Sequence, residues 1–220
     1  MRRLSTVLIL ATLALGLPLL AAARDGDIDK VNGSVHVAAG QQAGDVSTVN
    51  GAVHIDAGAV VHKASTVNGA VTLGDKAQAS ELGTVNGAIT LGTGGRVSGA
   101  VNAVNGSIRL ARGADVGGKL DNVNGAIVLN AAHVGGGIST VDGDITVGAD
   151  SRVEGGIVVE KPGGWFHWGS ERKPLIVIGP HAVVQGTLEF RREVVLKVSD
   201  SAQIGPVKGA TVVKFGGAQP

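Results

Sequence analysis

The chain is poor in the residue types that give most globular proteins their core and their cross-links. Its 220 residues include no Cys and no Tyr, and aromatic residues make up 2% of the total. The absence of Cys excludes a disulfide framework, a thiolate-bound metal and a cysteine nucleophile. The scarcity of aromatic rings argues against an ordinary globular core, in which such rings supply much of the buried area.

Charge is also scarce, because Asp, Glu, Lys and Arg account for 17% of the residues and nearly cancel to a formal net charge of +1. A nucleic-acid-binding domain carries a dense basic face, so we expect no nucleic acid partner. What the chain has in quantity is glycine, with 36 residues, and hydrophobic residues at 44%. This composition does not fit a disordered polar chain and favours narrow, repeated, extended structure.

Residues 1–23 have the layout of an export signal. Arg2 and Arg3 give a basic start, residues 4–20 are mostly apolar, and Ala21-Ala22-Ala23 supplies small residues before Arg24. This order indicates a secretory signal peptide cleaved near Ala23, and hence a periplasmic or secreted protein. The alternative is a retained membrane anchor, although the apolar run is short for a span. After removal of the signal we expect no transmembrane span.

A short motif recurs along the rest of the chain at a nearly constant interval. The tripeptide Val-Asn-Gly, which is Val-Asp-Gly in its last copy, recurs every 18 or 19 residues, and its copies begin at Val31, Val49, Val67, Val85, Val104, Val123 and Val141. Each copy is followed by an alternating strand such as 34–37. Counted with period 2, the motif's Val and Gly share a face with the next two apolar residues, and we expect that face to be buried.

A unit of 18 or 19 residues is too short to fold alone and matches one coil of a β-helix with about three short strands. Coils stacked at about 4.8 Å would bury Val and Ile in a thin core, which accounts for the missing aromatic residues. We therefore predict an all-β fold, a single-stranded β-helix or solenoid of about ten coils. We expect a right-handed helix, and the coil length by itself leaves the hand open.

The Asn-Gly pairs are expected at corners, because both residues tolerate left-handed backbone conformations. Stacked corners would allow a structural ladder of hydrogen-bonded side chains, formed by Asn32, Asn50, Asn68, Asn86, Asn105 and Asn124 and continued by Asp142. The alternative is that each Asn serves only its own turn and faces water.

The repeat continues beyond a break near residue 160. Residues 24–160 form the regular part, and in 175–220 the segments 184–188 and 204–207 repeat the half-coil pattern of 97–101. Residues 161–174 lie outside the repeat and contain Pro near both ends, so we expect a loop or hairpin insertion there.

The insertion holds three of the chain's five aromatic residues. An exposed aromatic patch would suit a glycan, a lipid headgroup or a partner protein, and the candidate contact residues are Trp165, Phe166, His167 and Trp168. The alternative is that the two Trp side chains fold back over a groove on the solenoid. We expect Phe190 and Phe215 to plug the last coils.

No catalytic constellation emerges from the sequence. His36 and His54 lie one repeat apart and should stack on the outer face, but the equivalent residues in later repeats supply no third metal ligand. The acidic residues share no register that would pair carboxylates for glycoside hydrolysis. Phosphate-binding, nucleophile-elbow and zinc-protease motifs are absent. We therefore expect no enzyme activity, no cofactor and no metal.

The coil length, the composition and segments such as 178–186, with the sequence Ile-Gly-Pro-His-Ala-Val-Val-Gln-Gly, resemble bactofilins, the polymer-forming cytoskeletal proteins of bacteria. The resemblance extends in pattern over most of 31–215. It implies a short β-helix that assembles end to end without nucleotide. Bactofilins are cytoplasmic, whereas this chain begins with an export signal, and its Val-Asn-Gly motif and insertion match no motif of that family.

These observations favour an exported, non-enzymatic structural or interaction protein of the bacterial envelope that self-associates through the ends of its β-helix. Residues 24–150 carry 8 basic and 12 acidic residues, and 151–220 carry 9 and 6, a polarity that would help end-to-end contact. The alternative is a carbohydrate-active β-helix, either a polysaccharide-binding module or a lyase- or hydrolase-like enzyme. A structural or interaction protein would have another protein or a second copy of itself as its partner. A carbohydrate-active β-helix would have an envelope polysaccharide as its partner.

Overall fold

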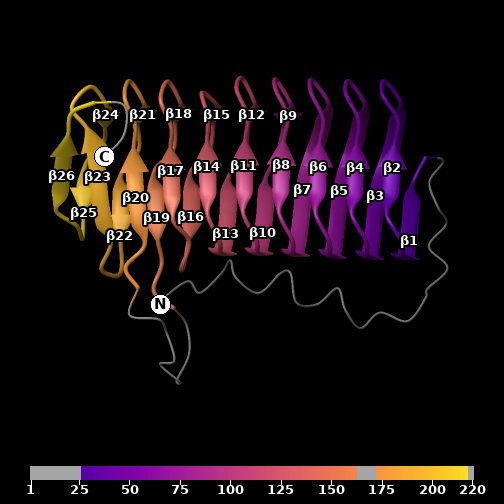
Figure 1. The fold of residues 1–220 in the computed structure, drawn as a ribbon, viewed down its shortest axis with the longest axis horizontal. Helices are drawn as coiled ribbons and strands as arrows, with labels where there is room; N and C mark the ends of the chain where they lie inside the picture. Colours follow the sequence, from indigo (N-terminus) through magenta and orange to yellow (C-terminus); the bar gives the residue numbers. More distant parts are fainter. Residues whose placement is uncertain (1–25, 163–171, 218–220) are drawn as a thin grey trace, which may run out of the picture.

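The computed structural model describes residues 26–162 and 172–217, which form one long β-solenoid (Figure 1). Within these residues all elements are strands, and each strand pairs in parallel with the equivalent strand of the next coil. The register advances by 18 residues in the first coils, as from Ile28 to Val46, and by 19 where the sequence repeat is longer, as from Val101 to Leu120. The predicted all-β solenoid is confirmed.

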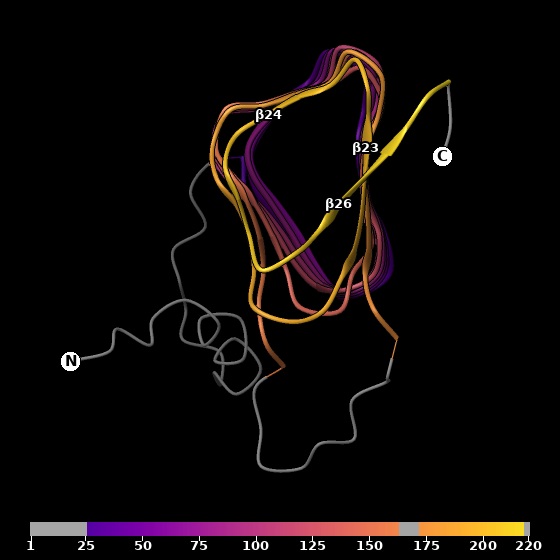
Figure 2. The ribbon, with the colours of Figure 1, turned by 90° about the vertical axis from the view of Figure 1, so that its left-hand side faces the viewer.

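Each coil has three faces, which are superposed when the solenoid is viewed along its axis (Figure 2). The second face is a ten-stranded parallel sheet. Its strands are β2 (Val35–Val37), β4 (Val53–Ile55), β6 (Val71–Leu73), β8 (Ile89–Leu91), β11 (Ile108–Leu110), β14 (Ile127–Leu129), β17 (Ile145–Val147), β20 (Leu175–Ile178), β23 (Val195–Ser199) and β26 (Val212–Phe215).

The first and third faces belong to one continuous sheet in the early coils, because their strands are long enough to cover both. The first face contains β1 (Ile28–Asn32), the C-terminal halves of β3 (Gln42–Asn50), β5 (Val60–Asn68) and β7 (Gln78–Asn86), and then β10 (Val101–Asn105), β13 (Leu120–Asn124), β16 (Ile138–Thr140), β19 (Ile157–Val159), β22 (Leu188–Phe190) and β25 (Val207–Lys208). The third face contains the N-terminal halves of the same long strands, followed by β9 (Arg96–Val97), β12 (Asp115–Val116), β15 (His133–Val134), β18 (Arg152–Val153), β21 (Val183–Val184) and β24 (Gln203–Ile204).

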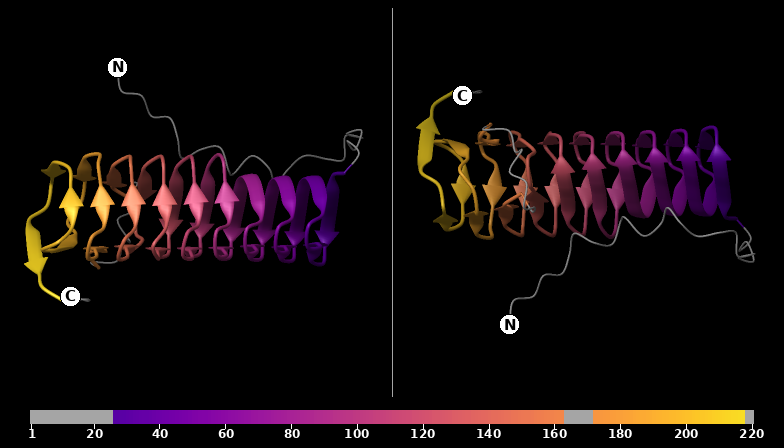
Figure 3. Two further views of the ribbon diagram at one scale, coloured as in Figure 1. Left: turned by 90° about the horizontal axis from the view of Figure 1, so that it is seen from above. Right: turned by 90° about the horizontal axis from the view of Figure 1, so that it is seen from below.

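The core is a thin stack of aliphatic side chains. On the second face one inward row consists of Val35, Val53, Val71, Ile89, Ile108, Ile127, Ile145 and Ile176, each at most 1% exposed. Burial of each such side chain stabilises the fold by about 1.5–3 kcal/mol relative to exposure. The coils before the last remain aligned along the rod (Figure 3), and their buried side chains form one continuous hydrophobic core.

The Val of the Val-Asn-Gly motif points outward, so the prediction that it is buried was wrong. Val31 and Val49 are 67% and 41% exposed, whereas Val35 and Thr48 are buried. The period-2 alternation does not continue through the corner, because the backbone turns there, with φ of +97° at Gly33. The alternation of inward and outward side chains therefore starts again after each corner. The motif's Val belongs to the alternation of the strand before the corner, in which its position points outward.

The Gly of the motif is needed for close approach of two backbones. A Cβ atom built on Gly106 would lie 1.8 Å from the carbonyl oxygen of Gly87 in the preceding coil, and one on Gly87 would lie 1.9 Å from that of Gly69. No side chain could be accommodated at these positions unless the corners moved apart. Glycine therefore lets the corners stack at the same spacing as the strands.

The C-terminal coil departs from this regular path. After β25 the chain turns early, and β26 pairs with β23 while crossing the end of the coil diagonally (Figure 2). Phe190 lies inward in register with Val159 and is 5% exposed, which agrees with its predicted place in the last coils. Phe215 lies in β26 and is half-buried.

We predict that Gly106→Ala lowers the free energy of unfolding by at least about 2 kcal/mol, because the new methyl group overpacks two backbones. Gly83→Ala is the matched control, since a Cβ there meets only the Ser65 Cβ at 3.9 Å. Urea denaturation followed by circular dichroism measures both. Equal stability of the two variants would contradict the close-approach argument.

Candidate functional site

The corner between the first and second faces, here called the asparagine corner, carries a chain of side-chain hydrogen bonds. Each amide Nδ2 donates to the Oδ1 of the Asn in the preceding coil at 3.0–3.1 Å, and the chain links Asn32, Asn50, Asn68, Asn86, Asn105 and Asn124. All six residues are exposed. The hydrogen-bonded ladder expected from the spacing therefore forms, and it lies on an outer edge of the solenoid.

A second row of hydrogen bonds, which the repeat did not predict, lies just inside this corner. The hydroxyl groups of Thr48, Thr66 and Thr84 are buried and donate to the carbonyl oxygens of Gly33, Gly51 and Gly69 at 2.8–2.9 Å. The sequence signal is a Thr two residues before the Asn in these repeats. These hydroxyl groups satisfy inward-facing corner carbonyls that would otherwise be buried without a partner.

In later coils other residues occupy the positions of these buried Thr residues, and their hydrogen bonds differ. Ala103 occupies the next register position, and Asn122 follows, with its Nδ2 donating to the carbonyl oxygens of Gly106 and Gly125 at 3.0 and 2.9 Å. The Asn122 Oδ1 is buried with no hydrogen-bond partner among the described residues. Thr140 instead accepts from the Gly143 N–H at 3.0 Å.

Thr66→Val is expected to lower the free energy of unfolding by about 1–2 kcal/mol, because the Gly51 carbonyl loses its donor while the side-chain shape is kept. Thr90→Val on the outward row of β8 should change it by no more than about 0.5 kcal/mol. Thermal unfolding of the two variants in parallel provides the measurement. A loss as large for the Thr90 variant would show that the buried hydroxyl is not the cause.

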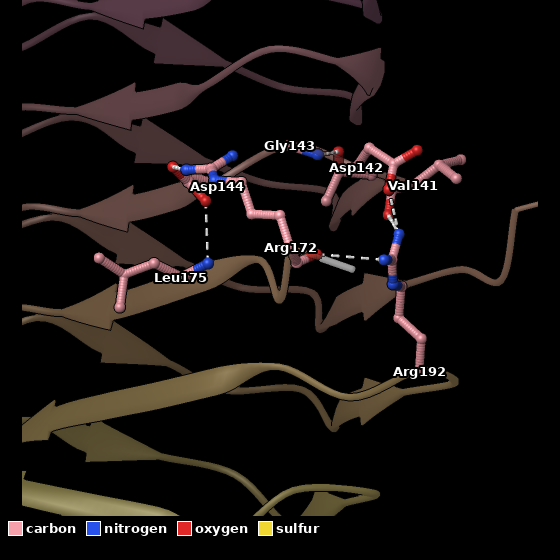
Figure 4. A network of polar contacts seen from close by, with 8 residues as sticks. Val141, Asp142, Gly143, Asp144, Arg172, Leu175 and Arg192 are labelled. Carbon is pink, nitrogen blue, oxygen red and sulfur yellow. Dashed lines mark hydrogen bonds and ion pairs between the residues drawn. The ribbon is translucent and has the colours of Figure 1, made fainter. Parts of the chain in front are cut away.

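The asparagine ladder ends at the Val-Asp-Gly copy of the motif. Asp142 occupies the next position, but its carboxylate accepts a hydrogen bond from Arg192 rather than extending the amide chain (Figure 4). Arg192 also donates to the carbonyl oxygens of Val141 and Arg172 at 3.2 and 3.3 Å. Because Arg192 is 50 residues away in sequence, no local pattern could have indicated this contact.

The same network holds the base of the insertion. Val159 is in register with Thr140 and Ile176 with Ile145, so the described chain ends that flank the insertion lie at the asparagine corner. Asp144 pairs with Arg172 and accepts from the backbone N–H of Leu175 at 2.9 Å (Figure 4). The change from the usual Asn and Ala or Ser to two Asp residues in this motif is therefore explained by the two arginines that face them.

We predict that Arg192→Ala lowers the free energy of unfolding by about 1–2 kcal/mol, because Asp142 then loses its charged partner in a partly buried corner. Arg109→Ala is the control, since Arg109 is an exposed outward residue of β11 with no ion pair among the described residues. Chemical denaturation at neutral pH measures both effects. If the Arg192 variant were as stable as the control, the corner would not depend on this pair.

The predicted contact residues Trp165, Phe166, His167 and Trp168 lie outside the described residues. The stacked pair His36 and His54 is found on the outer side of the second face, as expected. Among residues 26–162 and 172–217, no group of three or more His, Asp or Glu side chains is arranged to hold a metal ion. In the same part of the chain no helix is both long enough and apolar enough to cross a membrane.

The surface charges pair between successive coils. The Nδ1 atom of His62 lies 2.6 Å from a carboxylate oxygen of Asp45, and that of His133 lies 2.6 Å from one of Asp115. The Lys63 Nζ atom lies 3.7 Å from the Glu81 Oε2 atom. Asp121 is an exception on the first face, where burial raises the pKa of its carboxyl group despite the opposing effect of Lys119. The dominant pattern is a set of exposed ion pairs that link one coil to the next.

Comparisons of this chain with protein-family models, with curated protein sequences and with solved structures gave no match.

Proposed function

We propose that the protein is an exported, non-enzymatic structural or interaction protein of the bacterial envelope that acts as a short rigid rod. The observation that supports this proposal most is the repetition of the same side chains in the same places along the rod. The asparagine ladder links six successive coils, and the aliphatic core is continuous through all of them.

Rigidity follows from the number of independent links between coils. Each coil is joined to the next by backbone hydrogen bonds on three faces, by its corner side chains and by stacked core residues. Bending the rod would strain all of these links at once. Ten coils at about 4.8 Å give a rod about 48 Å long, which is suited to holding attached groups at a fixed distance.

The more specific form of this proposal is that copies of the protein associate through their ends. The N-terminal end shows what such a contact would require. At the N-terminal end β1 pairs only with β3 among the described residues, and an open edge of this kind can pair with another strand. Lys30 occupies the register position that buried Thr48 fills in the next coil, and its Nζ donates to the Ser34 carbonyl oxygen at 2.9 Å. Lys30 is exposed at this end, and a Lys on an edge strand discourages further stacking.

Negative-stain microscopy and size-exclusion chromatography of the purified protein test both levels of the proposal. We expect stiff particles about 48 Å long, and we expect Lys30→Thr to increase end-to-end multiples several-fold because Thr restores the register residue. Flexible particles without a constant length would contradict the rod. End-to-end multiples that do not increase in the Lys30 variant would show that Lys30 does not restrain stacking.

A further inference from the structure

The motif's outward valines form a row on the first face that the rod proposal does not explain. This valine row consists of Val31, Val49, Val67, Val85, Val104, Val123 and Val141, one in each of seven successive coils. Val31 and Val49 are exposed and the other five are half-buried beside their stacked neighbours. At one strand spacing per coil the row is about 29 Å long.

Strand formation alone does not require Val at these positions. Thr has the same branching at Cβ and a similar preference for strands, and it is better solvated. The neighbouring outward row on the first face varies freely, with Asp29, Ser47, Ser65, Gly83, Asn102, Asp121 and Ser139. The outward row of the second face varies as well. The constancy of Val in this one outward row therefore indicates a requirement for apolar contact.

A partner that touches the whole row must have the same repeat. A molecule with a different spacing loses register with the valines after a few coils, whereas a second copy of this chain has the same spacing along its entire length. We propose that the valine row pairs two copies of this protein face to face, with their long axes antiparallel and Val85 of each copy on the two-fold axis. Val31 then meets Val141 of the second copy, and Val49 meets Val123.

The charges on the first face fit this arrangement. With Val85 on the axis, Asp29 faces Ser139 of the second copy and Asp121 faces Ser47, while Gly83 faces its own equivalent. No two carboxylates of the neighbouring row are brought together. Beyond the seventh coil the positions equivalent to the valines are Glu160 and Arg191, which pair with each other at 2.7 Å within one chain. These charged residues lie outside the overlap of the two copies.

The size of the contact sets the expected strength. A patch about 29 Å long and five residues, or about 16 Å, wide covers roughly 450 Å² on each copy. Their sum, about 900 Å², is below the roughly 1,200 Å² at which stable specific interfaces begin and corresponds to a weak, transient dimer. We therefore expect dimerisation at micromolar or higher concentrations. This inference depends neither on export nor on the ends of the rod.

Analytical ultracentrifugation of the full chain, of Val85→Lys and of Val85→Thr tests the pairing, with Thr90→Lys on the second face as the control. Val85→Lys places two like charges on the axis and should weaken dimerisation at least 100-fold. Val85→Thr should weaken it less, and Thr90→Lys should leave it unchanged. A monomeric wild-type chain at 200 μM, or equal dimerisation by Val85→Lys in a folded state confirmed by circular dichroism, would overturn the proposal.

Because the chain contains no Cys, single cysteine variants report the register directly. Sheets packed face to face lie about 10 Å apart, beyond the reach of a direct disulfide, so a short bis-maleimide serves as the cross-linker. With it, Val85→Cys should cross-link to the same position of the second copy, since both residues lie beside the two-fold axis. Val31→Cys alone should not do so, but a mixture of Val31→Cys and Val141→Cys should cross-link. Efficient cross-linking of Val31→Cys with itself would reject the antiparallel arrangement, and equal cross-linking of a Thr90→Cys variant would reject the face.

Discussion

The structure depends on how closely two successive corners can approach. Parallel strands lie about 4.8 Å apart, and a coil keeps its register only if its corners close to the same spacing. At the asparagine corner this is possible because Gly87 and Gly106 have no side chain where the preceding carbonyl group lies. Glycine fixes the corner spacing, the corner spacing fixes the register, and the register stacks each residue on its counterpart.

Because the register is constant, a residue type that recurs at one position of the coil forms a continuous row along the rod. An aliphatic residue at an inward position becomes a continuous core, and an Asn at a corner becomes a chain of amide hydrogen bonds. A charge repeated in the same place would instead give a row of like charges, which is destabilising. The low charge content follows from this constraint, as does the alternation of the charges that remain, such as Lys63 beside Glu81 and Asp115 beside His133. The composition is thus a consequence of stacking.

The repeat made the coil, the core residues and the asparagine ladder predictable, because all three depend on spacing alone. The orientation of Val31 was not predictable by counting, since the alternation restarts at a corner whose geometry is set by Gly33. The inner hydrogen bonds of Thr48, Thr66 and Thr84 depend on which carbonyl groups turn inward, which spacing does not reveal. The pairing of Arg192 with Asp142 joins residues 50 positions apart and breaks the repeat, so only the three-dimensional structure shows it.

The surface changes after the seventh coil, and this change divides the rod into two parts with different outer surfaces. The outward valines follow the repeat through the first seven coils, and the asparagine corner follows it through the first six. In the next coil Glu160 replaces the valine, and Arg172 and Arg192 pair with Asp144 and Asp142 of the seventh coil. The core residues Ile157 and Leu188 continue without interruption across this boundary. The hydrophobic core is therefore continuous along the whole rod, whereas the outer surface follows the repeat only in the earlier coils, because inward positions must stack on one another and outward positions need not.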